Sequence, residues 1–183
     1  MKSAQTRVEG PNLVLRLIQP EDAVYVHGLR MNPAYNQYLS EVRGTAEDQR
    51  NWIENYKIRE AEGREFYYVI ERKGGQPCGV VRLYDLEAES FTWGSWILDA
   101  NKPPKAALES AVLSFGTGFK AFDRQRANID VRINNEHAQA FYRRLGMIET
   151  HKTETDIFFV YARIRYEADR EGYMKVLRKE GGV

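Results

Sequence analysis

One segment decides the fold: residues 131–147, which read VRINNEHAQAFYRRLGM. Its β-branched start closes an expected strand over Ala127–Ile133, and Asn135 follows at the position of a helix N-cap. Gly146 falls where a C-cap is expected. Between the caps, the expected helix Asn135–Leu145 turns four side chains inward: Ala138, Phe141, Tyr142 and Leu145. Helix capping and core packing alone can account for this pattern. The pattern alone therefore does not decide whether the segment is purely structural or also carries a function.

The apolar spacing elsewhere predicts the other elements. The expected strands are Asn12–Ile18, Glu65–Glu71, Cys78–Tyr84, Phe91–Leu98, one that starts at Met147–Glu149, and Ile157–Tyr166. The expected helices are one from Pro20 with Val24, Leu29 and Met31 inward, one from the capping box Thr45–Asp48, then Ala106–Phe122 and Glu167–Lys179. This order predicts a single α/β domain over residues 1–183, with residues 167–183 as a C-terminal helix and tail. Its central sheet is expected to be mixed and mostly antiparallel, with helices on both faces.

Composition excludes several classes of protein. The chain has 27 Lys+Arg against 26 Asp+Glu, and a net charge of +1 argues against a nucleic-acid partner. The single cysteine, Cys78, allows no internal disulfide, and the three histidines show no metal-ligand spacing, so no metal is expected. The segment Met1–Arg7 lacks the apolar core of a signal peptide, and no run of about 18 apolar residues spans a membrane. We therefore expect a cytoplasmic protein without a membrane partner, either a monomer or a homodimer.

Asn135, Ala138, Tyr142 and Gly146, spaced in this way after a strand, resemble the GNAT superfamily of acetyl-CoA-dependent N-acetyltransferases. The resemblance runs from Leu13 to Met147. Three segments are similar to the branch with ribosomal-protein N-acetyltransferases: Leu13–Arg16, Arg30–Pro33 and Cys78–Val81. Asn32–Tyr38, followed by the helix of Trp52, looks most like enzymes that acetylate amino groups of nucleotide-linked sugars.

This resemblance implies a GNAT fold with acetyl-CoA as cosubstrate. Tyr142 matches the family's tyrosine beside the coenzyme sulfur, where a protonated phenol can protonate the departing thiolate. Asn135 matches the asparagine that hydrogen-bonds the coenzyme arm. The strand Trp93–Leu98 matches the one whose backbone pairs with pantetheine, which places Ile97 and Leu98 nearest the thioester. Backbone amides near Leu98 are expected to polarise its carbonyl.

The expected pyrophosphate loop, Asn101–Ala107, departs from the family pattern. Lys105 and Ala107 stand where the family has glycines, and the two prolines at 103 and 104 offer no N–H. Amides from Lys105 through Ala106 and Ala107 remain at a helix N-terminus, and Lys102 and Lys105 add positive charge. Coenzyme binding is therefore expected to be altered but kept. The degenerate loop also leaves open a GNAT-like module that binds without transferring acetyl.

The expected acceptor is a primary amine of a small molecule, with a nucleotide-linked amino sugar favoured; a protein N-terminus or a polyamine remains the alternative. Trp93 and Trp96, three apart on one strand, are predicted to face opposite sides of the sheet. Glu87 and Glu89 could accept the ammonium proton or form a solvated turn. The residues expected to bind the acceptor are Arg30, Tyr35, Asn36, Tyr38 and Trp93.

Overall fold

The computed structural model describes residues 6–179. Residues 1–5, which belong to the segment examined for a signal peptide, lie outside the described residues. The same holds for residues 180–183 of the expected tail. One eight-stranded sheet has the order β1-β2-β3-β4-β5-β6-β8-β7, in which only β5 and β6 are paired in parallel. Its strands are β1 Arg7–Glu9, β2 Leu13–Leu17, β3 Phe66–Arg72, β4 Pro77–Tyr84, β5 Ser90–Leu98, β6 Arg126–Arg132, β7 Ile148–Lys152 and β8 Asp156–Ala162.

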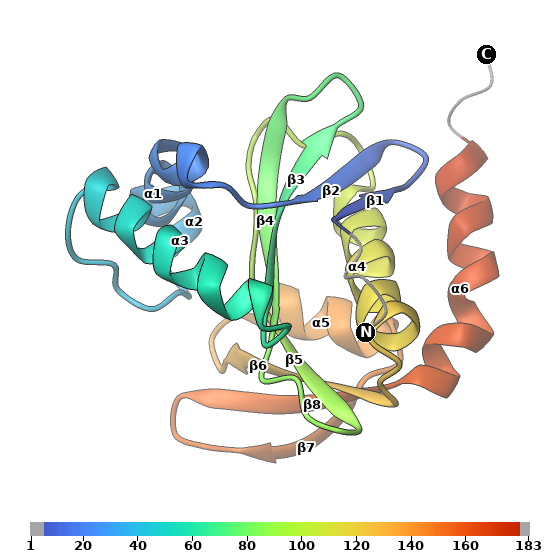
Figure 1. Ribbon diagram of the computed structural model, residues 1–183. Helices are drawn as coiled ribbons and strands as arrows, with labels where there is room; N and C mark the ends of the chain where they lie inside the picture. The colour runs from blue at the N-terminus through green and yellow to red at the C-terminus, as the bar shows by residue number, and fades with distance from the viewer. Residues whose placement is uncertain (1–5, 180–183) are drawn as a thin grey trace.

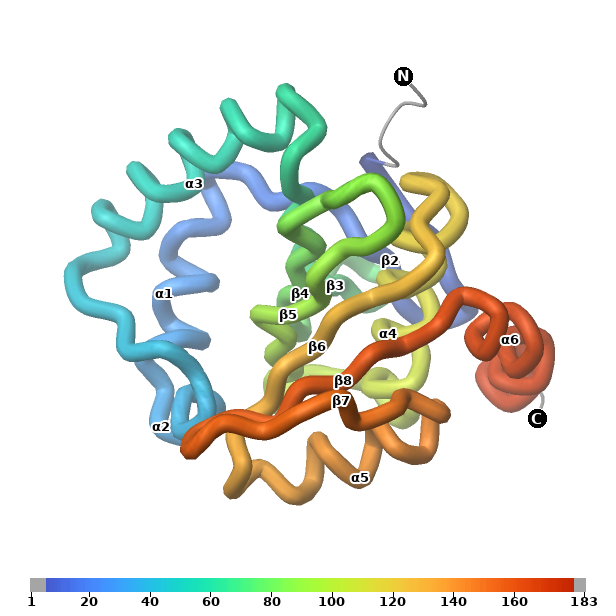
Figure 2. The backbone as a smooth tube through the Cα atoms, turned by 90° about the horizontal axis from the view of Figure 1, so that it is seen from below, coloured from blue at the N-terminus to red at the C-terminus, as the bar shows by residue number. Residues whose placement is uncertain are grey.

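Helices cover both faces of this sheet. They are η1 Pro20–Asp22, α1 Ala23–Met31, α2 Pro33–Asn36, α3 Ala46–Ala61, α4 Ala106–Gly116, the π-helical η2 Thr117–Ala121, α5 Glu136–Arg144 and α6 Arg163–Arg178. Figure 1 shows α1, α2 and α3 on one side of the strands and α4 and α6 on the other, and Figure 2 shows the same two layers from below. The predicted mixed, mostly antiparallel α/β sheet with helices on both faces is confirmed.

Each layer has its own hydrophobic core. Between the sheet and α4–α6 lies the larger one, to which alternate residues of β2 contribute Leu13, Leu15 and Leu17. The smaller one lies beneath α1 and α3 and contains Val26, Leu29, Ile53, Tyr56, Tyr67 and Val80. Because a strand turns successive side chains to opposite faces, β3, β4 and β5 each supply both cores. No helix within residues 6–179 is long and apolar enough to cross a membrane.

Three sequence expectations were wrong in detail. The strand β1 was not foreseen, because it is only three residues long. The last strand ends at Ala162 rather than Tyr166, and α6 begins at Arg163; there Arg163 pairs with Glu167 one turn on, and the Tyr166 hydroxyl donates to the carbonyl oxygen of Val112 at 2.9 Å. On α1, Val24 and Met31 face solvent, because Ala23, Val26 and Leu29 form the buried stripe instead.

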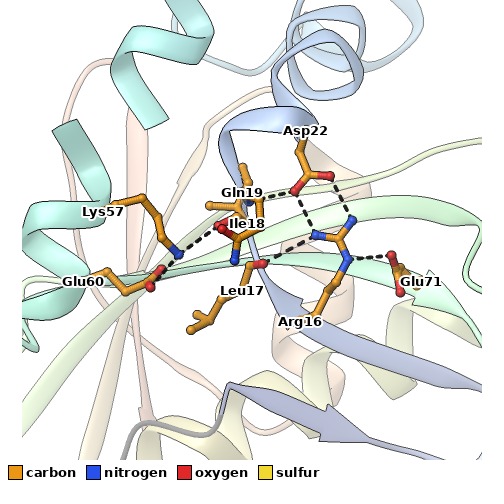
Figure 3. Close-up of polar contacts among 8 residues, drawn as sticks. All are labelled: Arg16, Leu17, Ile18, Gln19, Asp22, Lys57, Glu60 and Glu71. Carbon is orange, nitrogen blue, oxygen red and sulfur yellow. Dashed lines mark hydrogen bonds and ion pairs between the residues drawn. The ribbon is translucent and has the colours of Figure 1, made fainter. Parts of the chain in front are cut away.

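Charged side chains fix the α1–α3 layer to strands β2 and β3 (Figure 3). The Arg16 guanidinium on β2 donates to both carboxylate oxygens of Asp22 in η1, at 2.8 Å each, and to Glu71 on β3 at 2.6 Å. Hydrogen bonding to Asp22 raises the pKa of Arg16. Nearby, the Lys57 ammonium on α3 donates to the carbonyl oxygen of Ile18 at 3.2 Å. These contacts set the position of α1, whose C-terminal end reaches the site described below.

A buried carboxylate holds β2 against α4. Glu109 is fully buried and accepts hydrogen bonds from the backbone N–H groups of Asn12 (2.7 Å) and Leu13 (2.9 Å). Glu109→Ala leaves both donors unpaired, so we expect the free energy of unfolding to fall by about 2–4 kcal/mol. Urea unfolding measures the change. Glu109→Gln, which keeps one acceptor oxygen, is expected to cost less; equal effects of the two variants would contradict this role.

Candidate active site

A cleft opens where β5 and β6 separate. The two strands pair at only three positions, from Ser90 opposite Arg126 to Thr92 opposite Asn128. Beyond Thr92 they diverge around a cavity of about 280 Å³. Within the described residues, the β5 backbone past this point has no partner strand on its β6 side, so its peptide groups can pair with an extended ligand. The opening comes from the sheet itself.

A β-bulge in β5 shapes the cleft. Opposite β4, Arg82 pairs with Gly94 but Val80 pairs with Ile97, so β5 carries one extra residue. Ser95 takes up the distortion with a φ of 49°. This bulge overturns the prediction that the two tryptophans face opposite sides. The ring centroids of Trp93 and Trp96 lie 5.0 Å apart, and their indole N–H groups donate to Ser114 and Ser110 on α4.

The turn after β6 places Asn135 and Tyr142 at the cleft. Asn135 caps α5 by accepting from the N–H of Ala138 at 3.2 Å, and it also lines the cavity. Tyr142, which lies further along α5, also lines the cavity. Its ring is edge-on to the rings of Trp93 and Phe159, with centroid distances of 6.0 Å and 5.9 Å. Burial raises the pKa of Tyr142, and the negative charge of Asp130 raises it further. The phenol is therefore protonated at neutral pH and can donate a proton.

Asp130, which sequence reasoning missed, faces the same cavity. On β6 it alternates with the buried residues Ile129 and Val131, so its side chain lies on the α1–α3 face of the sheet. Asp130 is exposed at the surface of the cavity, but desolvation by the surrounding groups raises its pKa, and the negative charge of Asp156 adds to the shift. A carboxylate in this position can accept a proton from an amine in the cavity. The alternation of apolar and polar residues over 127–132 was the signal that could have identified it.

Only three of the five residues expected to bind the acceptor line the cavity. Arg30, Tyr38 and Trp93 line the cavity. Tyr35 does not line it; its hydroxyl accepts from the N–H of Ala100 at 3.0 Å and so joins α2 to the end of β5. Asn36, the last residue of α2, is also absent from the cavity wall.

The acidic loop before β5 also lies apart from the cavity. Glu87 lines a second hollow beside it, and the backbone carbonyl of Glu89 accepts from the N–H groups of Gln125 and Arg126 at the start of β6. Neither carboxylate is among the cavity-lining groups. Asp130 is therefore better placed than either to accept a proton there.

The N-terminus of α4 is the expected pyrophosphate site. Lys105 caps this helix in the left-handed region, at a φ of 61°, which is the conformation that glycine adopts without strain. Its ammonium lies 3.4 Å from the carbonyl oxygen of Val176 and so contacts the last turn of α6. The N–H of Ala106 donates to Pro103, whereas no described residue pairs with the backbone N–H of Ala107 or Leu108. Two helix N-terminal amides thus remain for an anion, which fits coenzyme A.

Other residues of the coenzyme prediction fall nearby. Ile97 is buried in the smaller core and Leu98 packs partly against the larger one, so the β5 backbone is the part open to the cleft. Lys102 follows the end of β5, where its backbone N–H donates to the carbonyl oxygen of Asp99 at 3.2 Å. Among residues 6–179, no group of three or more His, Cys, Asp or Glu side chains is arranged to hold a metal ion.

A split sheet, a bulged strand and a tyrosine-bearing helix thus meet at this cleft. The family described as Acetyltransferase (GNAT) domain matches residues 12–148. The chain therefore belongs to the GNAT acetyltransferase family.

Three known proteins illustrate the relationship. The structure titled "Apo FdhC- a nucleotide-linked sugar GNAT" is 33% identical, with a TM-score of 0.86, and the match covers 93% of this chain and 98% of that one. The uncharacterized N-acetyltransferase YokL from the SPbeta prophage of Bacillus subtilis (strain 168) is 24% identical over 85% of this chain and 86% of its own. RimL, a ribosomal L7/L12 alpha-N-protein acetyltransferase solved with coenzyme A, shares the fold at 16% identity and a TM-score of 0.74, over 85% of this chain and 97% of that one.

Proposed function

We propose that this acetyltransferase transfers the acetyl group of acetyl-CoA to the amino group of a nucleotide-linked amino sugar. The observation that carries the proposal is the pairing, in one cleft, of a proton acceptor and a proton donor. Asp130 lies on β6 and Tyr142 on α5, and both face the gap between β5 and β6. Acyl transfer to an amine requires both groups, since the amine must lose a proton and the thiolate must gain one.

Each residue has a defined part in this reaction. Acetyl-CoA supplies the acetyl thioester when bound. The open β5 backbone from Trp93 to Leu98 and the amides of Ala107 and Leu108 would hold its arm and pyrophosphate, and Asn135 lies beside them in the cleft. Asp130 takes up the proton of the incoming ammonium group. The Tyr142 hydroxyl provides the proton that leaves with the coenzyme thiol, and it regains a proton from the second N–H that the acetylated nitrogen loses.

The choice of acceptor rests on the charge of the cleft. Alongside the carboxylate of Asp130, the cavity is lined by the guanidinium group of Arg30 and by aromatic rings. A sugar with an amine at one end and phosphates at the other matches both charges, and sugar rings pack well on aromatic side chains. The 33% identity to a nucleotide-linked sugar GNAT over nearly the whole chain supports the same acceptor. A protein N-terminus or a polyamine is the alternative acceptor within the family.

A panel of amines tests the acceptor. Purified protein is incubated with acetyl-CoA and with amino-sugar nucleotides, unlinked amino sugars, polyamines or N-terminal peptides, and thiol release is followed. We expect the amino-sugar nucleotides to give the highest kcat/KM. Preferred acetylation of a peptide or a polyamine would overturn the proposed acceptor.

Binding of acetyl-CoA can be tested separately by thermal unfolding. A ligand that binds only the native state stabilises it by about 2.7 kcal/mol at 100 times its Kd. For a chain of this size, we expect the Tm to rise by about 5–10 °C at such a concentration. An unchanged Tm at millimolar acetyl-CoA would show that the loop at Lys105 has lost the coenzyme.

A further inference from the structure

A second hollow adjoins the acetyl-transfer cleft. It has a volume of about 380 Å³, and Tyr84 on β4 lines both cavities. Three arginines, Arg59, Arg64 and Arg82, line this second hollow together with the acids Glu65, Asp85 and Glu87. Because the two hollows share a wall, one extended ligand can occupy both.

A buried carboxylate holds two of these arginines in place. Glu65 is only 5% exposed and accepts from Nε of Arg59 and from Nε of Arg82, the latter at 2.8 Å. Burial acts to raise the pKa of Glu65, but the two guanidinium groups outweigh it and lower the pKa. Glu65 therefore stays ionised and orients both side chains. Since one carboxylate offsets only one of two cations, this cluster of three keeps a net positive charge.

Aromatic rings support the same guanidinium groups. Arg82 lies 4.4 Å from the ring centroid of Tyr84 and 5.5 Å from that of Trp52, and Arg59 lies 5.4 Å from the Trp52 ring. Such contacts restrict the rotamers of a long side chain. The terminal nitrogens of Arg59, and Nη1 of Arg82, have no hydrogen-bond partner within residues 6–179. These N–H groups are held in position to donate to an anion.

Arg30 extends the positive wall into the cleft itself. Its Nε atom is buried without a hydrogen-bond partner among the described residues, and the side chain lines the acetyl-transfer cavity. Arg82 packs over the ring of Tyr84, which lines the same cavity as Arg30, so both arginines border the surface around Tyr84. The wall built by α1, α3 and β4 thus carries Arg30, Arg82 and Arg59, while Asp130 lies on β6.

We propose that Arg30, Arg59 and Arg82 bind the diphosphate of a nucleoside-diphosphate amino sugar while its ammonium group lies at Asp130. This subsite rests on the proposed function and adds the part of the protein that recognises the nucleotide. Guanidinium groups bind phosphate oxygens through paired N–H donors, and all three arginines have donors left. A polyamine or a protein N-terminus carries no phosphate for these guanidinium groups to bind.

Calorimetric titration with UDP and dTDP tests the subsite. Saturating coenzyme A is present, so that the coenzyme's own diphosphate site is filled. Arg30→Gln is the main variant, because Arg30 has no ion-pair partner among residues 6–179. Its replacement therefore leaves no carboxylate without its counter-charge. Arg82→Lys keeps a cation for Glu65 but loses the paired donors. Arg50→Gln is the matched control, because it removes a partly exposed arginine from the same helix as Arg59, one that pairs only with the surface carboxylates of Glu21 and Glu54 among the described residues.

We expect both variants to raise the Kd for UDP or dTDP and the KM for an amino-sugar nucleotide about tenfold or more. The KM for acetyl-CoA and the activity of Arg50→Gln should stay within about twofold of the unsubstituted protein. Failure of UDP and dTDP to bind, or equal binding by Arg30→Gln, Arg82→Lys and the control, would overturn the subsite. The amine panel decides the acceptor independently: nucleotide binding that depends on the arginines supports the subsite even if another amine is acetylated.

Discussion

Replacing Tyr142 by phenylalanine is expected to lower kcat about 100-fold or more, with little change in the Kd for acetyl-CoA. The substitution removes only the hydroxyl, so the ring contacts with Trp93 and Phe159 remain. Because burial and Asp130 raise the pKa of Tyr142, the phenol carries its proton throughout the neutral range. Without the Tyr142 hydroxyl, the coenzyme thiolate must leave unprotonated or take a proton from water. Steady-state kinetics and a coenzyme titration measure the two quantities.

The matched control is Tyr161→Phe. Tyr161 is also a buried tyrosine of the larger core, and its hydroxyl has no hydrogen-bond partner within the described chain. Its removal should leave kcat unchanged and should not destabilise the fold, since an unpaired buried hydroxyl contributes nothing to stability. Equal kcat in Tyr142→Phe and Tyr161→Phe would remove Tyr142 from the proton-donor role.

Replacing Asp130 by asparagine is expected to lower kcat/KM for the acceptor about 100-fold or more at neutral pH. Asparagine keeps the size of the side chain but cannot take up the proton of the ammonium group. Asp130 works as a base only when ionised, so activity should be present above its pKa and fall as the pH drops through it. Because desolvation and the charge of Asp156 raise that pKa, the acidic limb should lie above the range of an ordinary aspartate.

The pH profile supplies a second test of Asp130. Asp156→Asn removes the nearby negative charge and releases Arg132, its ion-pair partner at 3.2 Å. Both changes favour the ionised form of Asp130, so the acidic limb of kcat/KM should move to lower pH. A profile that keeps its acidic limb in Asp130→Asn, or that does not move in Asp156→Asn, would assign the limb to another group.

The order of strands and helices could be predicted because each core strand alternates and each helix has a recognisable start or end. Residues 131–147 carried most of that information: Asn135 does cap α5, and Gly146 does follow it with a φ of 89°. The last boundary failed because Ile157–Tyr166 is apolar enough for a strand, while contacts of Tyr166 with α4 favour the helix.

The site could be predicted only in part, because it depends on irregularities of the sheet. The bulge at Ser95 places Trp96 on the same side of the sheet as Trp93. The spacing of the residues in the sequence does not predict this bulge. Asp130 becomes a cleft residue only because β6 separates from β5 after Asn128. The ammonium group of Lys105, an expected phosphate ligand, also donates to the carbonyl oxygen of Val176 on α6 at 3.4 Å. Each outcome follows from tertiary contacts between distant segments.

The most direct test of the central claim follows coenzyme A release from acetyl-CoA with a dTDP- or UDP-linked amino sugar as acceptor, with mass analysis of the sugar nucleotide. The account predicts thiol release that requires both substrates, a product carrying one acetyl group on its amine, and loss of both signals in Tyr142→Phe and Asp130→Asn. It would be contradicted if no amino-sugar nucleotide gained an acetyl group while a peptide N-terminus or a polyamine did.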